Sequence, residues 1–201
     1  MTIEELLSKC DLKIATEEQF KSCEAFACSN NDLNDFFAND ALPYQNYLLG
    51  KTYMFCLKSN PNIILSAFTL SNDSIRLTNA VSENDKNSFF TRTDLNQINL
   101  KRYPSVLIGR LGVNKDFERK GYGSAIMDFI KVLFLTRNKT GCRFIIVDAY
   151  NNPETIGYYQ KNGFDFFITD EEGEAKYIGL KKKHLPLKTR LMFFDLLRIK
   201  S

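Results

Sequence analysis

The segment from residue 118 to residue 124, which reads ERKGYGS, has residue types and spacing that could bind an anion. Glycine lets the backbone approach a ligand closely, and the N–H groups and dipole at a helix N-terminus favour negative charge. Two basic side chains add positive charge. The segment therefore predicts a pyrophosphate site formed by Arg119, Lys120, Gly121, Tyr122, Gly123 and Ser124.

Two other phosphate motifs do not fit this segment. A P-loop needs a lysine directly after its second glycine, and a dinucleotide fingerprint needs a third glycine near residue 126 and an early place in the chain. A lone pair of glycines at a helix start is most often turn chemistry. The context favours a ligand, because a second apolar strand and a helix ending in Tyr-x-x-x-Gly-Phe follow.

The elements that must position this turn can be predicted from hydrophobic periodicity. Ser105–Val113 and Arg143–Ala149 are apolar enough for buried strands. Helical spacing begins at Gly121, with one apolar stripe made of Ile126, Phe129, Ile130, Leu133 and Phe134. A second helix should start at Pro153, after Asn151 or Asn152 as its cap, and should stop at Asn162-Gly163.

The rest of the chain alternates between strands and helices. We expect a helix at Asp32–Leu42, capped by Asn31 or Asp32, and an antiparallel hairpin of Thr52–Lys58 and Ile63–Leu70. Residues 78–104 should hold a short helix or a loop. Three further strands are expected at Phe164–Ile168, Tyr177–Leu180 and Thr189–Leu196. This order predicts an α/β (α+β) fold over residues 1–201, a single domain with one mixed sheet and helices on its faces.

Composition limits the environment and the chemistry. No stretch approaches 18 uncharged apolar residues, and the acidic N-terminus has no apolar core, so we expect a cytoplasmic protein without a membrane segment or signal peptide. The chain has five cysteines, which is an odd number, and no C-x-x-C motif. All five lie far in sequence from the single histidine, His184. We therefore expect reduced, mostly buried thiols and no metal site.

The net charge of +3 is unevenly distributed. Residues 176–201 contain eight Lys and Arg residues and one acid, whereas the first 175 residues carry a net charge of −4. A basic end on a slightly acidic body predicts attraction to polyanions, although a solvated basic edge is the plainer interpretation. The candidate contacts are Lys181, Lys182, Lys183, Lys188 and Arg190.

The whole arrangement resembles the GNAT superfamily of acetyl-CoA-dependent N-acyltransferases. Residues 118–123 are similar to its phosphate motif [R/Q]-x-x-G-x-[G/A], with Glu118 in the place of Gln or Arg, and we expect this acid to point outward. The family's later motif, N-x-x-A-x-x-[FL]-Y-x-x-x-G-F, has Thr155 in the alanine place. Its matching residues are Asn152, Tyr158, Tyr159, Gly163 and Phe164.

This resemblance implies a site for acetyl-CoA between two splayed parallel strands, here Leu107–Val113 and Arg143–Ala149. It implies that the pantetheine arm is held by the main chain of Leu111, Gly112 and Val113 and that Asn152 also binds the cofactor. It gives Tyr159 the role of the acid that protonates the departing thiolate. Tyr158 is the competitor, but adjacent helical residues point about 100° apart and the motif register selects Tyr159. No general base is evident among Glu118, Asp148 and Glu154.

Three segments resemble a narrower group, the GNAT toxins of toxin–antitoxin pairs that acetylate aminoacyl-tRNA. They are Phe26–Phe37, Pro104–Val113 and, more loosely, Leu185–Thr189. The resemblance implies aminoacyl-tRNA as substrate and gives a ribbon-helix-helix antitoxin and a homodimer as candidate partners. The alternatives are a stand-alone enzyme for a small-molecule or protein amine, and a degenerate binding module. The presence of Gly121, Gly123 and Tyr159 argues against the module.

Overall fold

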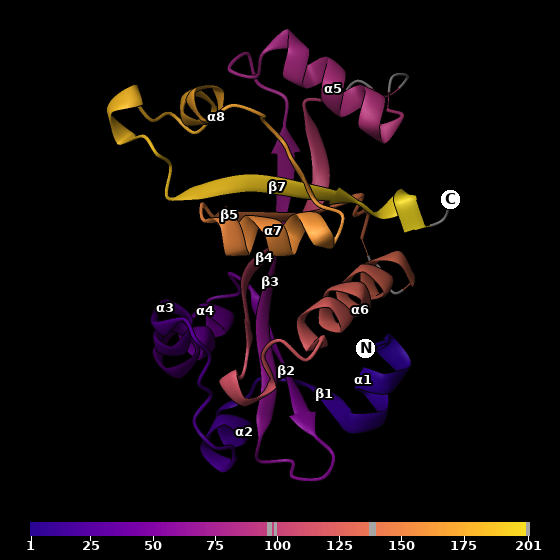
Figure 1. Cartoon of the computed structure of the whole chain (residues 1–201), viewed down its shortest axis with the longest axis vertical. Coiled ribbons are helices and arrows are strands. Elements are labelled where there is room, and N and C mark those ends of the chain that lie inside the picture. The colour runs from indigo at the N-terminus through magenta and orange to yellow at the C-terminus, as the bar shows by residue number, and fades with distance from the viewer. Residues whose placement is uncertain (96–97, 99, 137–139, 200–201) are drawn as a thin grey trace. The chain divides into compact units, whose positions relative to one another are not determined.

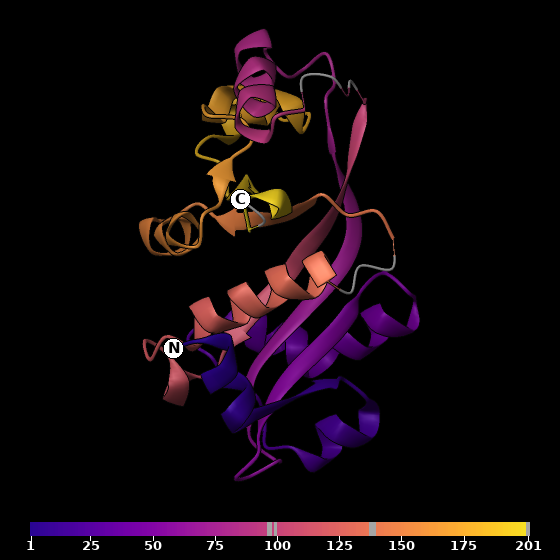
Figure 2. The same cartoon turned by 90° about the vertical axis from the view of Figure 1, so that its right-hand side faces the viewer.

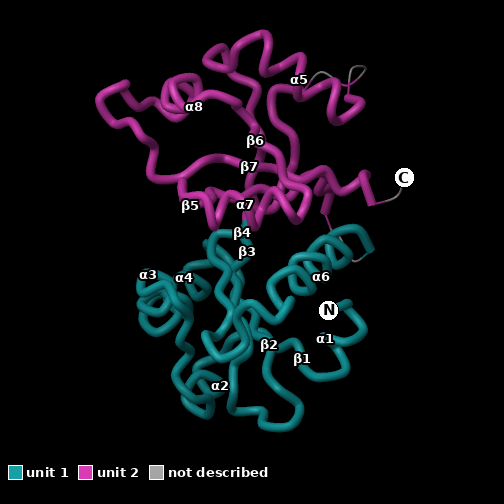
Figure 3. Tube along the Cα trace, viewed as in Figure 1, with its two compact units in different colours: residues 1–71, 108–136 teal, residues 72–107, 137–201 magenta. Residues whose placement is uncertain are grey.

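The computed structural model describes residues 1–95, 98, 100–136 and 140–199, and it divides the chain into two compact units. Unit 1 consists of residues 1–71 and 108–136, and unit 2 of residues 72–107 and 137–201 (Figure 3). Strands β3 (Ile64–Arg76) and β4 (Arg102–Val113) contribute residues to both units. That residues 1–201 act as a single domain stays a prediction.

Unit 1 contains the antiparallel part of the sheet, in the order β1 (Cys10–Ile14), β2 (Lys51–Leu57), β3 and β4 (Figure 1). Strand β2 pairs antiparallel with both β1 and β3. The predicted hairpin is therefore confirmed, although β3 runs on to Arg76 instead of ending at Leu70. Strand β1 was not predicted from the sequence.

Helices cover both faces of the sheet in unit 1. Helices α1 (Ile3–Lys9) and α6 (Tyr122–Thr136) lie on one face, and α3 (Asn31–Asp35) and α4 (Ala41–Asn46) on the other (Figure 2). Side chains alternate along β2 accordingly. Met54 joins a buried cluster with Phe37, whereas Phe55 packs edge-on against Phe129 with ring centroids 5.2 Å apart.

The predicted helix at residues 32–42 is confirmed and extends further. It consists of α3, a π-helical turn at Phe36–Asp40 and α4, after a short helix α2 (Glu17–Ser22). Its cap is Asn30, whose Oδ1 accepts from the Leu33 N–H at 3.2 Å, and not Asn31 or Asp32 as expected.

Unit 2 contains the parallel part of the sheet, in the order β3, β4, β5 (Phe144–Tyr150), β7 (Thr189–Asp195) and β6 (Asp165–Phe166). Strands β4 and β5 pair in parallel from Ser105–Phe144 to Leu107–Ile146. The neighbouring β5–β7 ladder is antiparallel over seven residue pairs, from Phe144–Asp195 to Tyr150–Thr189. The predicted mixed α/β sheet is confirmed.

The α-helices that the structure describes in unit 2 are α5 (Glu83–Thr93), α7 (Pro153–Lys161) and α8 (Glu171–Tyr177), and short 3-10 helices lie at Lys182–His184 and Leu196–Ile199. Helix α5 lies within residues 78–104, of which residues 96, 97 and 99 are outside the described part. Its Phe89 is fully buried, and its ring contacts Tyr103, Phe144, Phe167 and Phe193. No helix in the described residues is long and apolar enough to cross a membrane.

Two strand predictions near the C-terminus need correction. Tyr177–Leu180 is not a strand, because Tyr177 ends α8 and the chain then turns at Gly179 with φ of +78°. Helix α8 forms there because Asp170 caps it, accepting from the Gly173 N–H at 2.8 Å. The strand expected at Phe164–Ile168 shortens to the two residues of β6. The last strand is confirmed as β7.

Candidate functional site

The glycine turn joins β4 to α6 within unit 1. A single 3-10 turn at Lys115–Phe117 follows β4, and α6 begins at Tyr122. Arg119 and Gly121 both have positive φ, 58° and 85°, a backbone region that favours glycine. The first N–H groups of an α-helix point out of its N-terminal end. The turn therefore brings the main chain of the predicted pyrophosphate residues to the head of a 15-residue helix.

The side chains of the turn divide into buried and exposed groups. Tyr122 is buried, and its ring contacts Phe117 edge-on at 5.8 Å. Lys120 is exposed but held in place, because its Nζ donates to the Asp116 carbonyl at 2.7 Å and lies 5.6 Å from the Phe117 ring centroid. Arg119 is exposed as well. Positive charge thus lies beside the turn.

Glu118 does not point out into solvent as expected. It is half-buried, and its two carboxylate oxygens accept from Ser29, one from the N–H at 2.9 Å and one from the hydroxyl at 2.6 Å. The neighbouring Lys115 N–H also donates to the Ala27 carbonyl at 2.9 Å. Ser29 lies 89 positions from Glu118 in the chain, so no sequence pattern could have predicted it as a support of the turn.

The same N-terminal segment packs against the end of β4. A Cβ atom added at Gly112 would lie 3.0 Å from Cζ of Phe26 and 3.4 Å from Sγ of Cys28, so glycine lets these side chains contact the strand. Asn34 fixes the segment by accepting from the Cys28 N–H at 2.7 Å and donating to the Cys28 carbonyl at 3.0 Å. Leu111 and Val113 on either side are half-buried.

The second motif forms the ends of α7 in unit 2. Asn152 is the N-cap, accepting from the Thr155 N–H at 2.9 Å, and Pro153 is the first helical residue. Gly163 follows the helix with φ of +81°. The predicted helix is confirmed at both ends. Of the two predicted cap residues, it is therefore Asn152 that caps the helix, through its side-chain Oδ1.

Tyr159 lies on α7 and is half-buried. Its ring packs edge-on against Tyr158 at 5.1 Å and against Phe164 at 5.4 Å. Burial raises the pKa of the Tyr159 phenol well above its ordinary value. The hydroxyl is therefore protonated at neutral pH, the state that a proton donor needs.

Three acids were considered as general bases. Asp148 and Glu154 are exposed, and Glu118 is hydrogen-bonded to Ser29.

The basic residues near the C-terminus differ in their exposure. Arg190 was wrongly expected at the surface: it is buried, and its Nε donates to Oε2 of Glu174 at 2.7 Å. Lys182 pairs with Glu172 at 2.5 Å, and exposed side chains remain at Lys181, Lys183 and Lys188. Residues 200 and 201 lie outside the described part.

The five cysteines are free thiols, three of them buried. Burial is the main cause that raises the pKa of Cys10, Cys56 and Cys142 to about 11, which makes them poor nucleophiles. Within the described residues, no three or more His, Cys, Asp and Glu side chains are grouped so that they could hold a metal ion.

Comparison with known proteins gives one family match. Residues 85–165 match the family described as the acetyltransferase (GNAT) domain. This stretch includes β4, the glycine turn, α6, β5 and α7. No curated protein is significantly similar in sequence to the chain.

Solved structures show the same fold at low identity. A crystal structure of a KacT mutant has a TM-score of 0.67 and 17% identity, with 96% of this chain and 98% of that chain covered. AtaTR bound with AcCoA has a TM-score of 0.65 and 18% identity, covering 96% and 97%. AtaT complexed with acetyl-methionyl-tRNAfMet has a TM-score of 0.64 and 18% identity, covering 95% and 97%. With the family match and the two motifs in their expected elements, the chain contains an acetyltransferase domain of the GNAT family.

Proposed function

We propose that the protein transfers the acetyl group of acetyl-CoA to the α-amine of an aminoacyl-tRNA. One observation carries the acetyl-CoA part: a turn with left-handed Gly121 and two adjacent basic side chains opens α6 directly after β4. Main-chain N–H groups from Arg119 to Ser124 would bind the pyrophosphate. The cofactor's pantetheine arm would bind the main chain of Leu111–Val113, and Asn152 at the start of α7 would contact the cofactor.

Tyr159 is the proposed acid. The amine nitrogen attacks the thioester carbonyl, a C–N bond forms, and the C–S bond breaks to leave a thiolate, which takes the phenol proton. A raised pKa keeps the phenol protonated but also makes it a weaker acid. As the amide forms, the attacking amine loses one proton to solvent, and solvent returns one proton to the phenolate, which restores the phenol.

An α-amine as acceptor is supported by the chemistry of a site to which we assign no general base. A lysine amine has a pKa of about 10.4, whereas an α-amino group titrates near 7.7–8.0, and an ester on its carboxyl lowers this further. An α-amine can therefore attack without a strong base. The aminoacyl-tRNA substrate is also supported by a structural neighbour, because the structure of AtaT was solved in complex with acetyl-methionyl-tRNAfMet. Lys181, Lys183 and Lys188 are exposed and available to RNA phosphates.

The proposed protein partners are an antitoxin and a second copy of the chain. AtaT occurs in complex with the C-terminus of the antitoxin AtaR, together with acetyl-CoA. By analogy, a small ribbon-helix-helix antitoxin would bind this chain. Co-expression with the product of an adjacent reading frame, followed by size-exclusion chromatography, tests both assemblies.

The substrate is tested by incubating the purified protein with acetyl-CoA and charged total tRNA. Mass spectrometry of the released aminoacyl adenosines should show a mass increase of one acetyl group on at least one of them. Tyr159→Phe is the control for enzymatic transfer. Binding of acetyl-CoA without any acetylated aminoacyl adenosine would contradict the tRNA assignment and favour a small-molecule or protein amine.

A further inference from the structure

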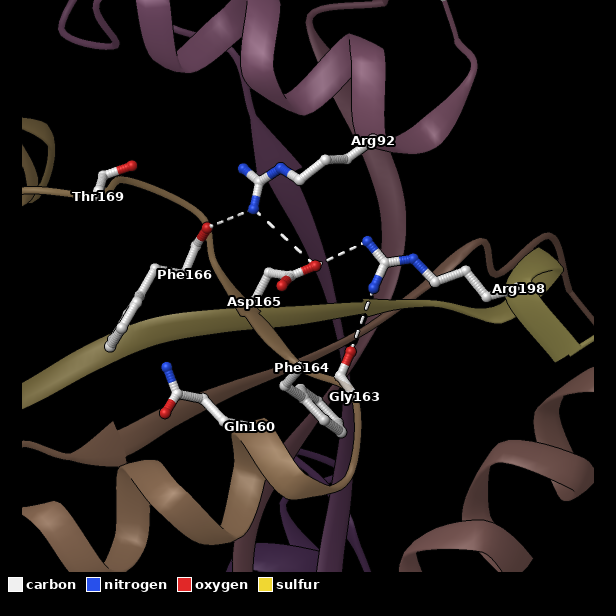
Figure 4. Close-up of a pocket in the computed structure, with 8 residues that line it drawn as sticks. All are labelled: Arg92, Gln160, Gly163, Phe164, Asp165, Phe166, Thr169 and Arg198. Carbon is white, nitrogen blue, oxygen red and sulfur yellow. Dashed lines mark hydrogen bonds and ion pairs between the residues drawn. The ribbon is translucent and has the colours of Figure 1, made fainter.

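An open cavity of about 420 Å³ lies within unit 2 (Figure 4). Its size is that of a site for a small ligand. The residues around it come from α5, the end of α7, β6 and the C-terminal 3-10 turn at Leu196–Ile199. They are Arg92, Gln160, Gly163, Phe164, Asp165, Phe166, Thr169 and Arg198.

Two guanidinium groups in this cavity share one carboxylate. Arg92 and Arg198 reach toward Asp165 from opposite sides (Figure 4), with Nη···Oδ2 distances of 3.9 and 2.7 Å. Together the three side chains carry a formal charge of +1. Burial is the main cause that lowers the pKa of the Arg92 guanidinium, and the charge of Arg198 also lowers it, whereas the carboxylates of Asp165 and Asp85 raise it. A bound anion would act on Arg92 in the same direction as these carboxylates.

Arg92 is held in place and keeps a donor for a ligand. Its Nε donates to the Ser88 carbonyl at 3.2 Å, and its Nη1 donates to the Phe166 carbonyl at 3.1 Å. Nη2 has no acceptor among the residues that the structure describes. On the other side, Arg198 is fixed by donating Nη1 to the Gly163 carbonyl at 3.2 Å. The planar fork of arginine suits a phosphate group.

An aromatic ring lies next to these charges. The Arg190 guanidinium stacks on the Phe166 ring, 4.4 Å from its centroid, and is itself neutralised by Glu174. Phe166 also lines the cavity, so a planar ligand could stack on the ring. Gln160 extends from α7 toward the same space (Figure 4), where its amide could bond the edge of a heterocycle.

We propose that this cavity binds a nucleotide, with the phosphate on Arg92 and Arg198 and the base stacked on Phe166. The site goes beyond the proposed acetyl transfer, because its residues are different from those assigned to acetyl-CoA. Nucleotide chemistry has two sources, a free mononucleotide and the end of an RNA strand.

The test is isothermal titration calorimetry of the full chain with AMP, GMP, CMP and UMP. At least one should bind, and the nucleoside with the same base should bind at least about 10-fold more weakly, because it lacks the phosphate and its charge-assisted hydrogen bonds. Arg92→Gln should weaken nucleotide binding by a similar factor, and Phe166→Leu should weaken it at least about 5-fold. Arg102→Gln, an exposed arginine of unit 2 outside the cavity, is the matched control.

Further experiments distinguish nucleotide binding in this cavity from the proposed binding of acetyl-CoA. Nucleotide binding should persist with saturating acetyl-CoA and in Gly121→Val, whatever that variant does to acetyl-CoA binding. Competition with acetyl-CoA would overturn the proposal, and so would equal affinity for inorganic phosphate, or no binding by any mononucleotide. A trinucleotide that binds about 10-fold more tightly than its terminal mononucleotide would identify an RNA end as the source. Equal affinity would identify the free nucleotide.

Discussion

At the scale of single residues, Glu118 stands where the family's phosphate motif has Gln or Arg, and it is hydrogen-bonded to Ser29. Glu118 accepts two hydrogen bonds from Ser29, and this fixes the start of the glycine turn to the segment before α3. The two donors also direct the negative charge toward Ser29. Glu118 is thus a positioning residue, and its unusual identity is matched by a serine far away in the sequence.

Ser29→Ala should therefore weaken acetyl-CoA binding. It removes the hydroxyl donor but keeps the N–H donor, so we expect a loss of about 3- to 10-fold, since a hydrogen bond to a charged group contributes about 1.5–3 kcal/mol when fully lost. Calorimetry measures the affinity. In the double variant with Glu118→Gln, the two effects should not add. Additive losses would mean that the pair does not act through one contact.

Tyr159→Phe should lower kcat by about 10²- to 10⁴-fold, the usual contribution of general acid catalysis. The change removes only a hydroxyl from a ring that packs against Phe164, so acetyl-CoA affinity should stay nearly constant. Steady-state kinetics and calorimetry measure the two quantities. Tyr158→Phe is the neighbouring control. Loss of activity in Tyr158→Phe alone would shift the assignment by one residue.

Gly121→Val should abolish acetyl-CoA binding. A β-branched residue is strained at φ of +85°, and its Cβ would lie 3.4 Å from Cβ of Met1. Because of this strain the backbone of the turn would have to shift, and its N–H groups would lose their alignment. Calorimetry with acetyl-CoA measures the effect. Gly141→Val is the matched control, because a Cβ there meets no atom within 4 Å. Unchanged affinity in Gly121→Val would contradict the assignment of this turn.

At the scale of elements, α8 and β7 are joined by a buried ion pair. Arg190 of β7 donates to Glu174 of α8 at 2.7 Å and also to the Ile168 and Thr169 carbonyls, each at 3.0 Å. Glu174 also accepts from the Leu191 N–H. This network explains why a residue in a basic segment is structural.

Arg190→Ala should destabilise the fold by about 3–5 kcal/mol, because it leaves the Glu174 carboxylate buried without its partner. Urea unfolding followed by circular dichroism measures the free energy of unfolding. Lys188→Gln, at an exposed position two residues earlier, should change it by less than about 0.5 kcal/mol. Equal stability of the two variants would show that the pair contributes nothing.

At the scale of the whole molecule, the charge asymmetry concerns affinity for RNA. Replacing Lys181, Lys183 and Lys188 with Gln should weaken binding of charged tRNA and reduce the slope of log affinity against log salt by roughly one per lost phosphate contact. Binding measured at several salt concentrations gives the slope. The control replaces three other exposed lysines, namely Lys21, Lys51 and Lys101. If the slope is unchanged when Lys181, Lys183 and Lys188 are replaced, these lysines do not contact RNA phosphates and are only exposed to solvent.

The sequence by itself determined the features that depend on neighbouring residues. The buried strands β4, β5 and β7, the start of α6 and both ends of α7 follow from local periodicity, caps and glycine positions, and all were predicted. Local patterns failed at Tyr177–Leu180, where β-favouring residue types lie at the end of a helix that is held by the distant Arg190.

Only the tertiary structure decided which charges are available and which support the fold. Ser29 engages Glu118, Glu174 engages Arg190, and Asp165 lies between Arg92 and Arg198, in each case across at least 16 residues of chain. Such pairs depend on the packing of elements that are separate in sequence, and a charged residue looks the same in a sequence whether it is paired or exposed. The reason is physical: burial and the distance to an opposite charge set its energy, and both arise only when the chain is folded.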